Sequence, residues 1–258
     1  MRLSPSAERA GARLRVLDTV GSTNAEALAC ARAGERGPLW ITARAQTSGR
    51  GRRGRVWTSE PGNLYASFLQ VGAVPAAVAP QLSFVCGLAL RDALTEVAPA
   101  LRGRMALKWP NDLLVDGRKI AGILIEGEFV AGDALAVVAG IGVNCAHHPE
   151  GANATALSAE GEAVPPGRLF TALADAMLSR QRQWNGGRNF GTTRADWLAL
   201  AKGVGTLVKV RGNDGEIEGV FETLDASGQL VLRRHDGAAQ LIAAGDVVMP
   251  DTVPGAAG

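Results

Sequence analysis

The hydrophobic pattern of the chain changes at Gly203, and this change constrains the fold more than any other feature of the sequence. Beyond Gly203, short runs alternate between apolar and polar residues and are separated by turn pairs such as Ser227-Gly228 and Asp236-Gly237. Alternation with a period of two is typical of strands that bury one face. The runs are residues 206–211, 216–223, 229–233 and 239–243. They predict a small all-β barrel or meander of roughly 50 residues.

The part before Gly203 mixes strand-like and helix-like segments without strict βαβ alternation. Its clearest helix covers 80–97, because Pro80 suits a helix start and apolar residues recur at helical spacing after it. Other helices are expected from the turn at 21–24 to Gly34, at 167–184 and at 193–202, and strands at 14–20, 39–45, 64–71, 104–109, 113–115, 119–126 and 134–144. This mixture predicts an α+β domain with a mixed or antiparallel sheet and flanking helices. We predict a large domain over 1–203, a small one over 204–252 and a disordered Gly/Ala-rich tail over 253–258.

Composition and charge exclude several classes of protein. Apolar residues make up 47% of the 258 residues, which is enough for a packed core and excludes a disordered chain. The net charge of +2 argues against a protein that coats nucleic acid. Cys30, Cys86 and Cys145 lie far apart, so we expect reduced, mostly buried thiols rather than disulfides or a zinc site. No unbroken apolar run reaches the roughly 18 residues of a membrane span and no secretory signal is seen, so we expect a cytoplasmic protein.

Four arginines fall between Arg50 and Arg55, interleaved with glycines. Glycine lets a backbone approach a ligand closely, and arginine offers planar, bidentate donors that suit phosphate or carboxylate. Because ordering such a loop is entropically unfavourable, we expect it to be mobile when empty and to close over an anionic ligand when one is bound. An RNA-binding segment or a merely solvated basic loop is an alternative interpretation of the same residues.

Lys119 opens an otherwise apolar strand. A lysine in this place either snorkels to solvent at the strand end or meets an anion. Strict strand alternation would put Lys119 on one face with Ala121 and Ile123, and Gly122 on the other face.

A turn with two polar residues precedes that strand. Asn111 and Asp112 follow Pro110, a place where Asn and Asp are common for structural reasons. A carboxylate there could also hold Mg²⁺ beside a phosphate, because Mg²⁺ usually takes one or two protein carboxylates together with phosphate oxygens.

The strand at 134–144 ends in alternating glycines. By alternation Gly140, Gly142 and Asn144 share one face, while the three apolar residues next to them face the core. The glycine face would be bare backbone on which a flat ring could lie. A bulged strand with close backbone packing is an equal alternative.

Taken in order, these stretches resemble the biotin protein ligase family over about residues 15–145. The resemblance rests on Gly21-Ser22-Thr23-Asn24, Gln46, Gly49 to Arg55, Trp57, Gly62-Asn63-Leu64-Tyr65, Lys108-Trp109-Pro110-Asn111-Asp112, Lys119 to Glu126 and Gly140 to Asn144. The all-β tail is similar to the small SH3-like C-terminal domain of that family. The resemblance implies a catalytic domain like those of class II synthetases, followed by this small barrel.

The resemblance also implies a reaction. Members of the family join the biotin carboxylate to the α-phosphate of ATP, release pyrophosphate, and transfer biotin to a lysine of a biotin carboxyl carrier protein. It implies that biotin is bound by Ser22, Thr23, Asn24, Gln46, Gly49, Arg50, Gly51, Arg52, Lys119 and Gly122. It implies that ATP is bound by Arg53, Arg55, Trp57, Asn111, Asp112 and Asn144, with Asp112 as a Mg²⁺ ligand. Lys119, Arg50 and Arg52 would be catalytic, with Lys119 bridging the biotin carboxylate and the α-phosphate.

Two rival functions fit parts of the pattern. A lipoate protein ligase would share the fold and the acyl-adenylate chemistry, and an RNA-binding module would use the arginine-rich loop and the barrel. Only 21 residues precede Ser22, so we expect no DNA-reading domain and no DNA partner. An exposed sheet edge would allow a homodimer, and we expect His147 and His148 to be exposed and inert.

Overall fold

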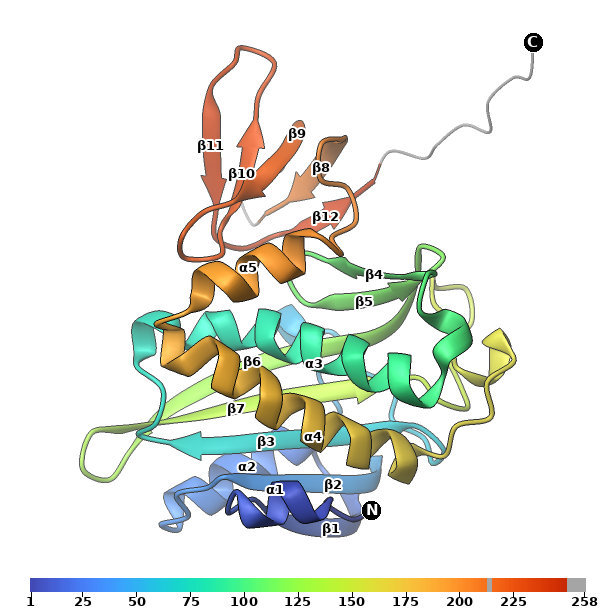
Figure 1. Ribbon diagram of the computed structural model, residues 1–258, viewed down its shortest axis with the longest axis vertical. Coiled ribbons are helices and arrows are strands. Elements are labelled where there is room, and N and C mark those ends of the chain that lie inside the picture. Colours follow the sequence, from blue (N-terminus) through green and yellow to red (C-terminus); the bar gives the residue numbers. More distant parts are fainter. Residues whose placement is uncertain (213–214, 250–258) are drawn as a thin grey trace.

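Two β-sheets of different size organise the chain (Figure 1). The structure is a computed structural model and describes residues 1–212 and 215–249. The tail predicted at 253–258 lies outside the described residues. The larger sheet is mixed and flanked by helices, and the smaller sheet is antiparallel, so the predicted α+β class is confirmed.

The larger sheet has the strand order β1-β2-β3-β7-β6-β5-β4. Its strands are β1 (Arg13–Val20), β2 (Leu39–Gln46), β3 (Leu64–Val71), β4 (Met105–Lys108), β5 (Asp112–Val115), β6 (Arg118–Val130) and β7 (Ala134–Val143). β1 and β2 run parallel, and every other neighbouring pair is antiparallel. Parallel strands need a crossover connection, which α2 (Thr23–Arg32) supplies.

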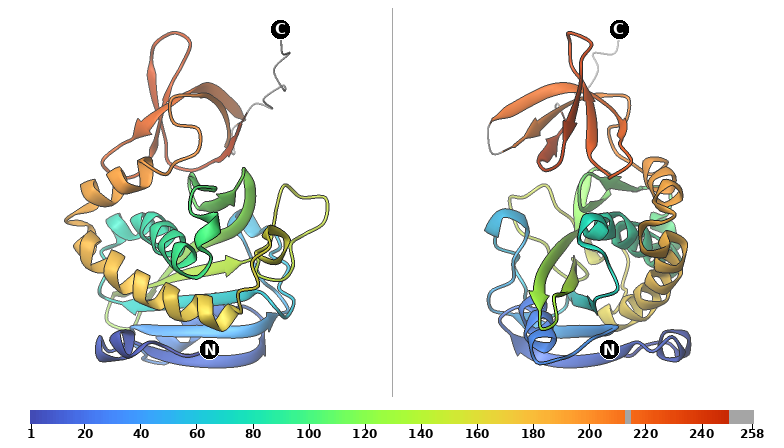
Figure 2. Two further views of the ribbon diagram at one scale, coloured as in Figure 1. Left: turned by 45° about the vertical axis from the view of Figure 1, so that its right-hand side comes forward. Right: turned by 90° about the vertical axis from the view of Figure 1, so that its left-hand side faces the viewer.

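Helices cover both faces of this sheet (Figures 1 and 2). α3 (Leu82–Val97) and α4 (Pro166–Trp184) pack together on one face, with α1 (Pro5–Arg9) against α4 and α5 (Phe190–Leu198) against both. α2 packs on the opposite face, against β2, β3 and β7. Each face of the sheet has its own hydrophobic core, and successive side chains of β2 point to opposite faces. Trp40 packs in the core on the α3 face, and Ile41 packs in the core on the α2 face.

A β-bulge interrupts the start of β6. In the pairing with β5, Leu113 lies opposite Ala121 but Leu114 lies opposite Lys119, so Ile120 is an extra residue. Ile120 and Ala121 are consequently both buried in the same core. A bulge of this kind shifts the alternation by one residue, and it moves the Lys119 side chain to the face of Gly122.

The smaller sheet has the order β11-β10-β9-β8-β12 and lies at one end of the molecule, beyond α5 and β4 (Figures 1 and 2). Its strands are β8 (Leu207–Arg211), β9 (Glu216–Leu224), β10 (Leu230–Arg233), β11 (Ala239–Ile242) and β12 (Asp246–Val248). It docks closely on the larger domain: Trp109 Nε1 donates to the Gly228 carbonyl at 3.1 Å. A Cβ on Gly228 would lie 2.7 Å from the Phe84 ring, so glycine permits this approach.

Several elements differ from those expected; for example, α1 was not predicted and β6 extends to Val130. α5 covers Phe190–Leu198 instead of 193–202, because Lys202 leaves the helix and its N–H donates to the Leu107 carbonyl at 2.7 Å. Pro80 lies in a short 3₁₀ helix (Ala76–Gln81), and α3 begins after it. β12 was not predicted, because three residues are too few to show alternation.

One helical segment, Ala76–Val97, is long and apolar enough by length and composition to cross a membrane. The search for unbroken apolar runs did not reveal it, because a few polar residues interrupt the segment. Its most apolar window is 61% buried inside the fold. The apolar side chains of α3 therefore serve as core, between the sheet and α4.

Candidate functional site

A cleft of about 260 Å³ lies on the α2 side of the larger sheet and is bordered by the loop after β2 and by Asp246 of β12. It brings together almost all residues predicted for the site. Those that line it are Ser22, Thr23, Asn24, Gln46, Arg50, Gly51, Arg52, Arg55, Trp57, Asn111, Asp112, Lys119, Gly122 and Asn144. Gly49 and Arg53 do not line it, although both were predicted to do so.

The reasons for these two exceptions are local. A Cβ on Gly49 would lie 2.4 Å from Ser59 Oγ and 2.5 Å from the Trp57 carbonyl, so Gly49 is packed beneath the loop and supports it from behind. Arg53 is at the tip of the loop with φ 56°, and its guanidinium donates to the Arg211 carbonyl at 3.4 Å, outside the cleft.

One end of the cleft is a network of amides and hydroxyls that ends at the Glu126 carboxylate, which is paired with Arg50. The backbone N–H and the hydroxyl of Thr23 donate to Gln46 Oε1 at 2.8 and 3.1 Å. The Ser67 hydroxyl lies 2.7 Å from Thr23 Oγ1 and 2.6 Å from Asn24 Oδ1. Asn24 Nδ2 donates to Glu126 at 2.7 Å. Such a fixed set of donors and acceptors matches a polar, uncharged ring rather than an anion.

The loop from Gly49 to Trp57 is a tight hairpin, whereas the sequence predicted an irregular loop. Arg50 forms a β-bridge with Val56, and the Gly51 N–H donates to the Arg55 carbonyl at 2.7 Å. Arg53 and Gly54 at its tip both have positive φ, as a type I′ turn requires. The hairpin therefore holds its arginines in a defined arrangement.

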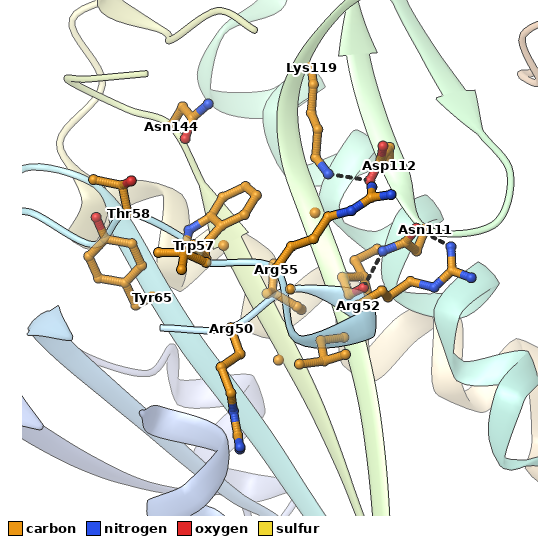
Figure 3. Close-up of a pocket in the computed structure, with 18 of the residues that line it drawn as sticks. Arg50, Arg52, Arg55, Trp57, Thr58, Tyr65, Asn111, Asp112, Lys119 and Asn144 are labelled. Atoms are coloured by element: carbon orange, nitrogen blue, oxygen red, sulfur yellow. Dashed lines mark hydrogen bonds and ion pairs between the residues drawn. The ribbon is translucent and has the colours of Figure 1, made fainter. Parts of the chain in front are cut away.

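The hairpin sends its arginines to two ends of the cleft (Figure 3). Arg50 points toward the amide end, where its guanidinium lies 3.5 Å from Glu126. Arg52 lies at the other end, and it donates to Asn111 Oδ1 at 3.3 Å and to the Gly245 carbonyl at 3.1 Å. Burial lowers the pKa of Arg52, and the nearby positive charges act in the same direction. Arg52, Arg55 and Lys119 outnumber the carboxylates of Asp112 and Asp246 in the cleft lining, so this second end is cationic.

Lys119 lies at the cationic end, with its ammonium 2.6 Å from Asp112 Oδ1 (Figure 3). A Cβ on Gly122 would lie 3.2 Å from the Lys119 ammonium. The expectation that Lys119 and Gly122 face opposite sides is therefore wrong, because the bulge at Ile120 changes the phase of the strand. The bulge aims the amine into the cleft, and the pair with Asp112 argues against simple snorkelling.

The glycine face of β7 connects the two ends. A Cβ on Gly140 would lie 2.3 Å from the Asn24 amide, and one on Gly142 would lie 2.7 Å from the Trp57 indole. The predicted flat ring on this face is present, but it is the chain's own indole. The Lys119 ammonium is 5.4 Å from the centre of that ring. Trp57 Nε1 is buried with no hydrogen-bond partner among the described residues.

Asn144 ends the same face at the mouth of the loop that follows β7. Its Nδ2 donates to the Thr155 carbonyl at 3.0 Å, and the residue is 3% exposed. Asn63 holds the start of this loop, because its Oδ1 accepts from the backbone N–H groups of Cys145, Ala146 and His147 at 2.8, 2.9 and 3.1 Å. The side chains of His147 and His148 are exposed, as expected.

Sequence reasoning missed several residues of the cleft and of the hydrogen-bond network around Asn24. Ser67 is a fully buried polar residue in β3, and its hydroxyl in an otherwise apolar run was the signal that could have revealed it. Glu126 is the last residue of the motif Lys119 to Glu126, from which only Lys119 and Gly122 were predicted to bind a ligand. Asp246 gave no signal, because it arrives from a distant strand. Gly140 and Gly142, whose face was expected to accommodate a flat ring, also line the cleft, and the other cleft residues not predicted are Val56, Thr58, Tyr65, Ile123, Leu124, Ile141, Pro149, Ala152, Asn153 and Ala154.

Comparisons with known proteins agree with this geometry. Residues 23–144 match the biotin/lipoate A/B protein ligase family, and residues 205–249 match the biotin protein ligase C-terminal domain. The chain is 42% identical over 243 residues to a biotin–[acetyl-CoA-carboxylase] ligase of Paracoccus denitrificans, covering 90% of this chain and 98% of the relative. It is 36% identical over 250 residues to the enzyme of the same name from Mycobacterium tuberculosis, covering 93% and 91% of the two chains.

A solved structure is similar over nearly the whole chain. It is the biotin protein ligase of Aquifex aeolicus in complex with biotin and ATP, with a TM-score of 0.75 and 27% identity. The match covers 92% of this chain and 97% of the Aquifex chain. The similarity thus includes both the larger domain and the small barrel.

Proposed function

Because the chain belongs to the biotin protein ligase family, we infer that it activates biotin with ATP and transfers the biotin to a lysine of an acceptor protein. One observation carries this inference: a single cleft joins a neutral amide end to a cationic end across a glycine face. A ring with an amide-like edge fits the first end, and phosphates fit the second. Biotin and ATP would therefore meet at Lys119.

The first step requires two anions to approach each other. Fixed cations offset the repulsion between carboxylate and phosphate and stabilise the charge that develops at phosphorus. Lys119 and Arg52 are placed for this, because both are held on the wall of the cationic end. Thr23, Asn24 and Gln46 would orient the biotin ring, so that its carboxylate points along the glycine face toward Lys119.

The nucleotide would lie between the hairpin and the loop after β7. Arg55 and Trp57 come from the hairpin, and Asn144 from the end of β7, so these residues border one space (Figure 3). The indole is packed on Gly142, and its N–H is buried there without a partner in the described chain. Arg53 would act only from the rim.

The donor set suits Mg²⁺ delivered with the nucleotide. No cluster of three acidic, His or Cys side chains that could hold a metal by itself occurs within residues 1–212 and 215–249. Mg²⁺ usually binds through phosphate oxygens, waters and one or two carboxylates. Asp112 would be the protein ligand, once the phosphates take over its contact with Lys119.

In the second step the acceptor lysine is the nucleophile, so the enzyme has to position the intermediate rather than form a covalent bond with it. We propose a biotin carboxyl carrier domain as the acceptor, with the exposed sheet edges available to a second copy of the chain. We place the reaction in the cytoplasm, because Cys30, Cys86 and Cys145 are free and buried.

The rival functions differ from this one in what they would bind. A lipoate ligase is disfavoured because the C-terminal part of the chain matches the biotin protein ligase domain. An RNA-binding module gives no role to the buried network of Thr23, Asn24 and Ser67. A mass increase of one biotin on a carrier-domain lysine, dependent on ATP and absent with lipoate, tests all three functions at once.

The mechanism itself is tested at Lys119. We expect Lys119→Ala to lower biotin-dependent pyrophosphate release by roughly 100-fold or more, because a fixed cation at the reacting phosphate is lost. Lys209→Ala is the matched control, since Lys209 is a half-exposed lysine of the small barrel that pairs with Glu216. Pyrophosphate release by a folded Lys119→Ala variant at the wild-type rate would refute the role assigned to Lys119.

A further inference from the structure

Asp246 is negatively charged, which is unexpected for a residue that lines a site proposed to bind phosphates. It belongs to the small barrel, whereas the other residues that line the cleft belong to the larger domain. Its carboxylate lines the cleft and is 23% exposed. It lies 3.5 Å from Arg52, 3.6 Å from Arg53 and 2.5 Å from Arg55. One acidic side chain thus contacts both arginines at the cationic end of the cleft, Arg52 and Arg55, and also Arg53 outside it.

The small barrel, rather than the arginines, fixes the position of this carboxylate. Asp246 pairs with Arg211 in the β8–β12 ladder, and the next residue, Val247, is 1% exposed. A Cβ on Gly245 would lie 2.5 Å from Val210, so the strand is packed tightly just before Asp246. The Gly245 carbonyl accepts a second bond from Arg52 at 3.1 Å. The barrel therefore presents a preformed acceptor surface to the hairpin.

The balance of charge at this surface is incomplete. Three guanidinium groups contact the Asp246 carboxylate, and the nearby Asp112, which also acts on Arg52, is paired with Lys119, so positive charge remains in excess and repels itself. A polyphosphate would relieve that repulsion far better than one carboxylate does. The same carboxylate would repel a polyphosphate bound to these arginines, so the two anions compete for the same donors.

We propose that Asp246 is a positioning residue that acts as an exchangeable counter-ion: it holds Arg52, Arg53 and Arg55 in place until the phosphates of the nucleotide replace it. The small barrel thereby lowers the affinity of the cleft for polyphosphate and aids release of pyrophosphate. This inference rests on the proposed function, because it names what competes with ATP at that site.

The experiment compares Asp246→Asn with wild type at low salt. Asparagine keeps the shape but removes the charge, so we expect the KM for ATP and the Kd for inorganic pyrophosphate each to fall by about 3- to 10-fold. The KM for biotin stays unchanged. The gain shrinks at about 0.5 M KCl, because salt screens partly exposed charges. A merely structural role of Asp246 would give none of this selective, salt-dependent pattern.

Glu222→Gln is the matched control. It removes one negative charge from the same barrel, at a residue that pairs with Arg233 away from the cleft. Asp246→Ser provides a second variant if the asparagine disturbs the strand, and thermal melting checks both. Unchanged or weaker binding of pyrophosphate by folded Asp246 variants overturns the proposal.

The two proposals fail in different ways. Calorimetric binding of pyrophosphate needs no catalysis, so it tests Asp246 even if the chain shows no biotin-dependent reaction. Loss of the ligase proposal would appear as a wild-type chain that forms no biotin adenylate. Loss of the Asp246 proposal would appear as an active wild type whose Asp246 variants bind pyrophosphate no more tightly.

Discussion

At the scale of single residues, buried polar side chains fasten the loops that border the cleft. Asn63 is the clearest case: it is 5% exposed, accepts three backbone N–H groups and donates to the His147 carbonyl at 2.9 Å. The segment it holds leads from Asn144 into the loop that lines the cleft. Its effect on the site is therefore indirect, through the backbone.

Asn63→Ala should lower the free energy of unfolding by about 2 to 4 kcal/mol, because it leaves several buried N–H groups without an acceptor. We also expect the KM for ATP to rise, since the loop beside the nucleotide space loses its anchor. Urea unfolding and steady-state kinetics measure the two effects. Asn189→Ala is the comparison, because the Asn189 side chain makes no hydrogen bond at the start of α5. Equal stability of the two variants would contradict the assignment.

Most of the residues predicted for the site lie together, but the orientation of one of them was not predicted. Fourteen of the predicted residues line one cleft, because their motifs lie at strand ends and turns. The face of Lys119 could not be predicted, because a bulge depends on how β5 pairs with β6 and leaves no mark in the alternation of one strand. Ser67 was missed for a different reason: a lone serine in a strand is compatible with many environments.

At the scale of elements, the hairpin from Gly49 to Trp57 is the part on which the reaction depends most. Arg52 ties it to three places: the Asn111 amide, the Gly245 carbonyl and the Asp246 carboxylate. The side chain is 22% exposed, so these contacts are shielded from water more than those of an ordinary surface arginine. Arg52 therefore makes the most shielded of the contacts that fasten the hairpin, beside the ion pairs of Arg50, Arg53 and Arg55.

Arg52→Gly should speed the escape of the biotin adenylate by roughly 10-fold, because it removes all three ties and adds backbone freedom. Rapid-mixing release of the preformed intermediate, without acceptor protein, measures the rate. Arg53→Gly is the comparison and should have a smaller effect, since a glycine relaxes the positive φ at that position. An intermediate that leaves the Arg52 variant no faster than wild type would contradict the prediction.

Long elements were predicted better than short ones. α3 and β7 were predicted nearly to their ends, because many buried residues repeat with a clear period. The 3₁₀ helix at Ala76–Gln81 and β12 were not, because a single turn or three residues show no period. The early end of α5 depends on pairing with β4, which is a tertiary contact that no local pattern encodes.

At the scale of the whole molecule, two thiols and a phenol lie in the packed interior. Burial raises the pKa of Cys86, Cys145 and Tyr65 to about 12 in each case. Cys86 and Cys145 have an ordinary value of 9.0, and Tyr65 one of 10.0. The folded state therefore holds these protons more tightly than the unfolded chain does.

The raised pKa values predict a loss of stability in alkali. The stabilisation is complete below the ordinary pKa values and is lost at about 1.4 kcal/mol per pH unit for each group, between about pH 9 and 12 for the two thiols and between about pH 10 and 12 for the phenol. Cys86→Ala should have a shallower fall over that window, although the cavity lowers its stability at neutral pH. Denaturant unfolding at a series of pH values measures the slopes, and equal slopes would contradict the assignment.

The indole that rests on Gly122 and Gly142 has a consequence for selectivity. A ligand that binds on these glycines must displace Trp57. Its net gain in binding free energy is therefore only the difference between its own contacts with the glycines and those that Trp57 already makes. A small bare anion, attracted to the arginines, brings no apolar bulk with which to dislodge an aromatic side chain, and stays at the rim. A molecule that combines a fused ring or a long hydrocarbon chain with a charged group can displace the indole and at the same time contact the Lys119 ammonium. The glycines thus make the site discriminate by shape before any bond is formed.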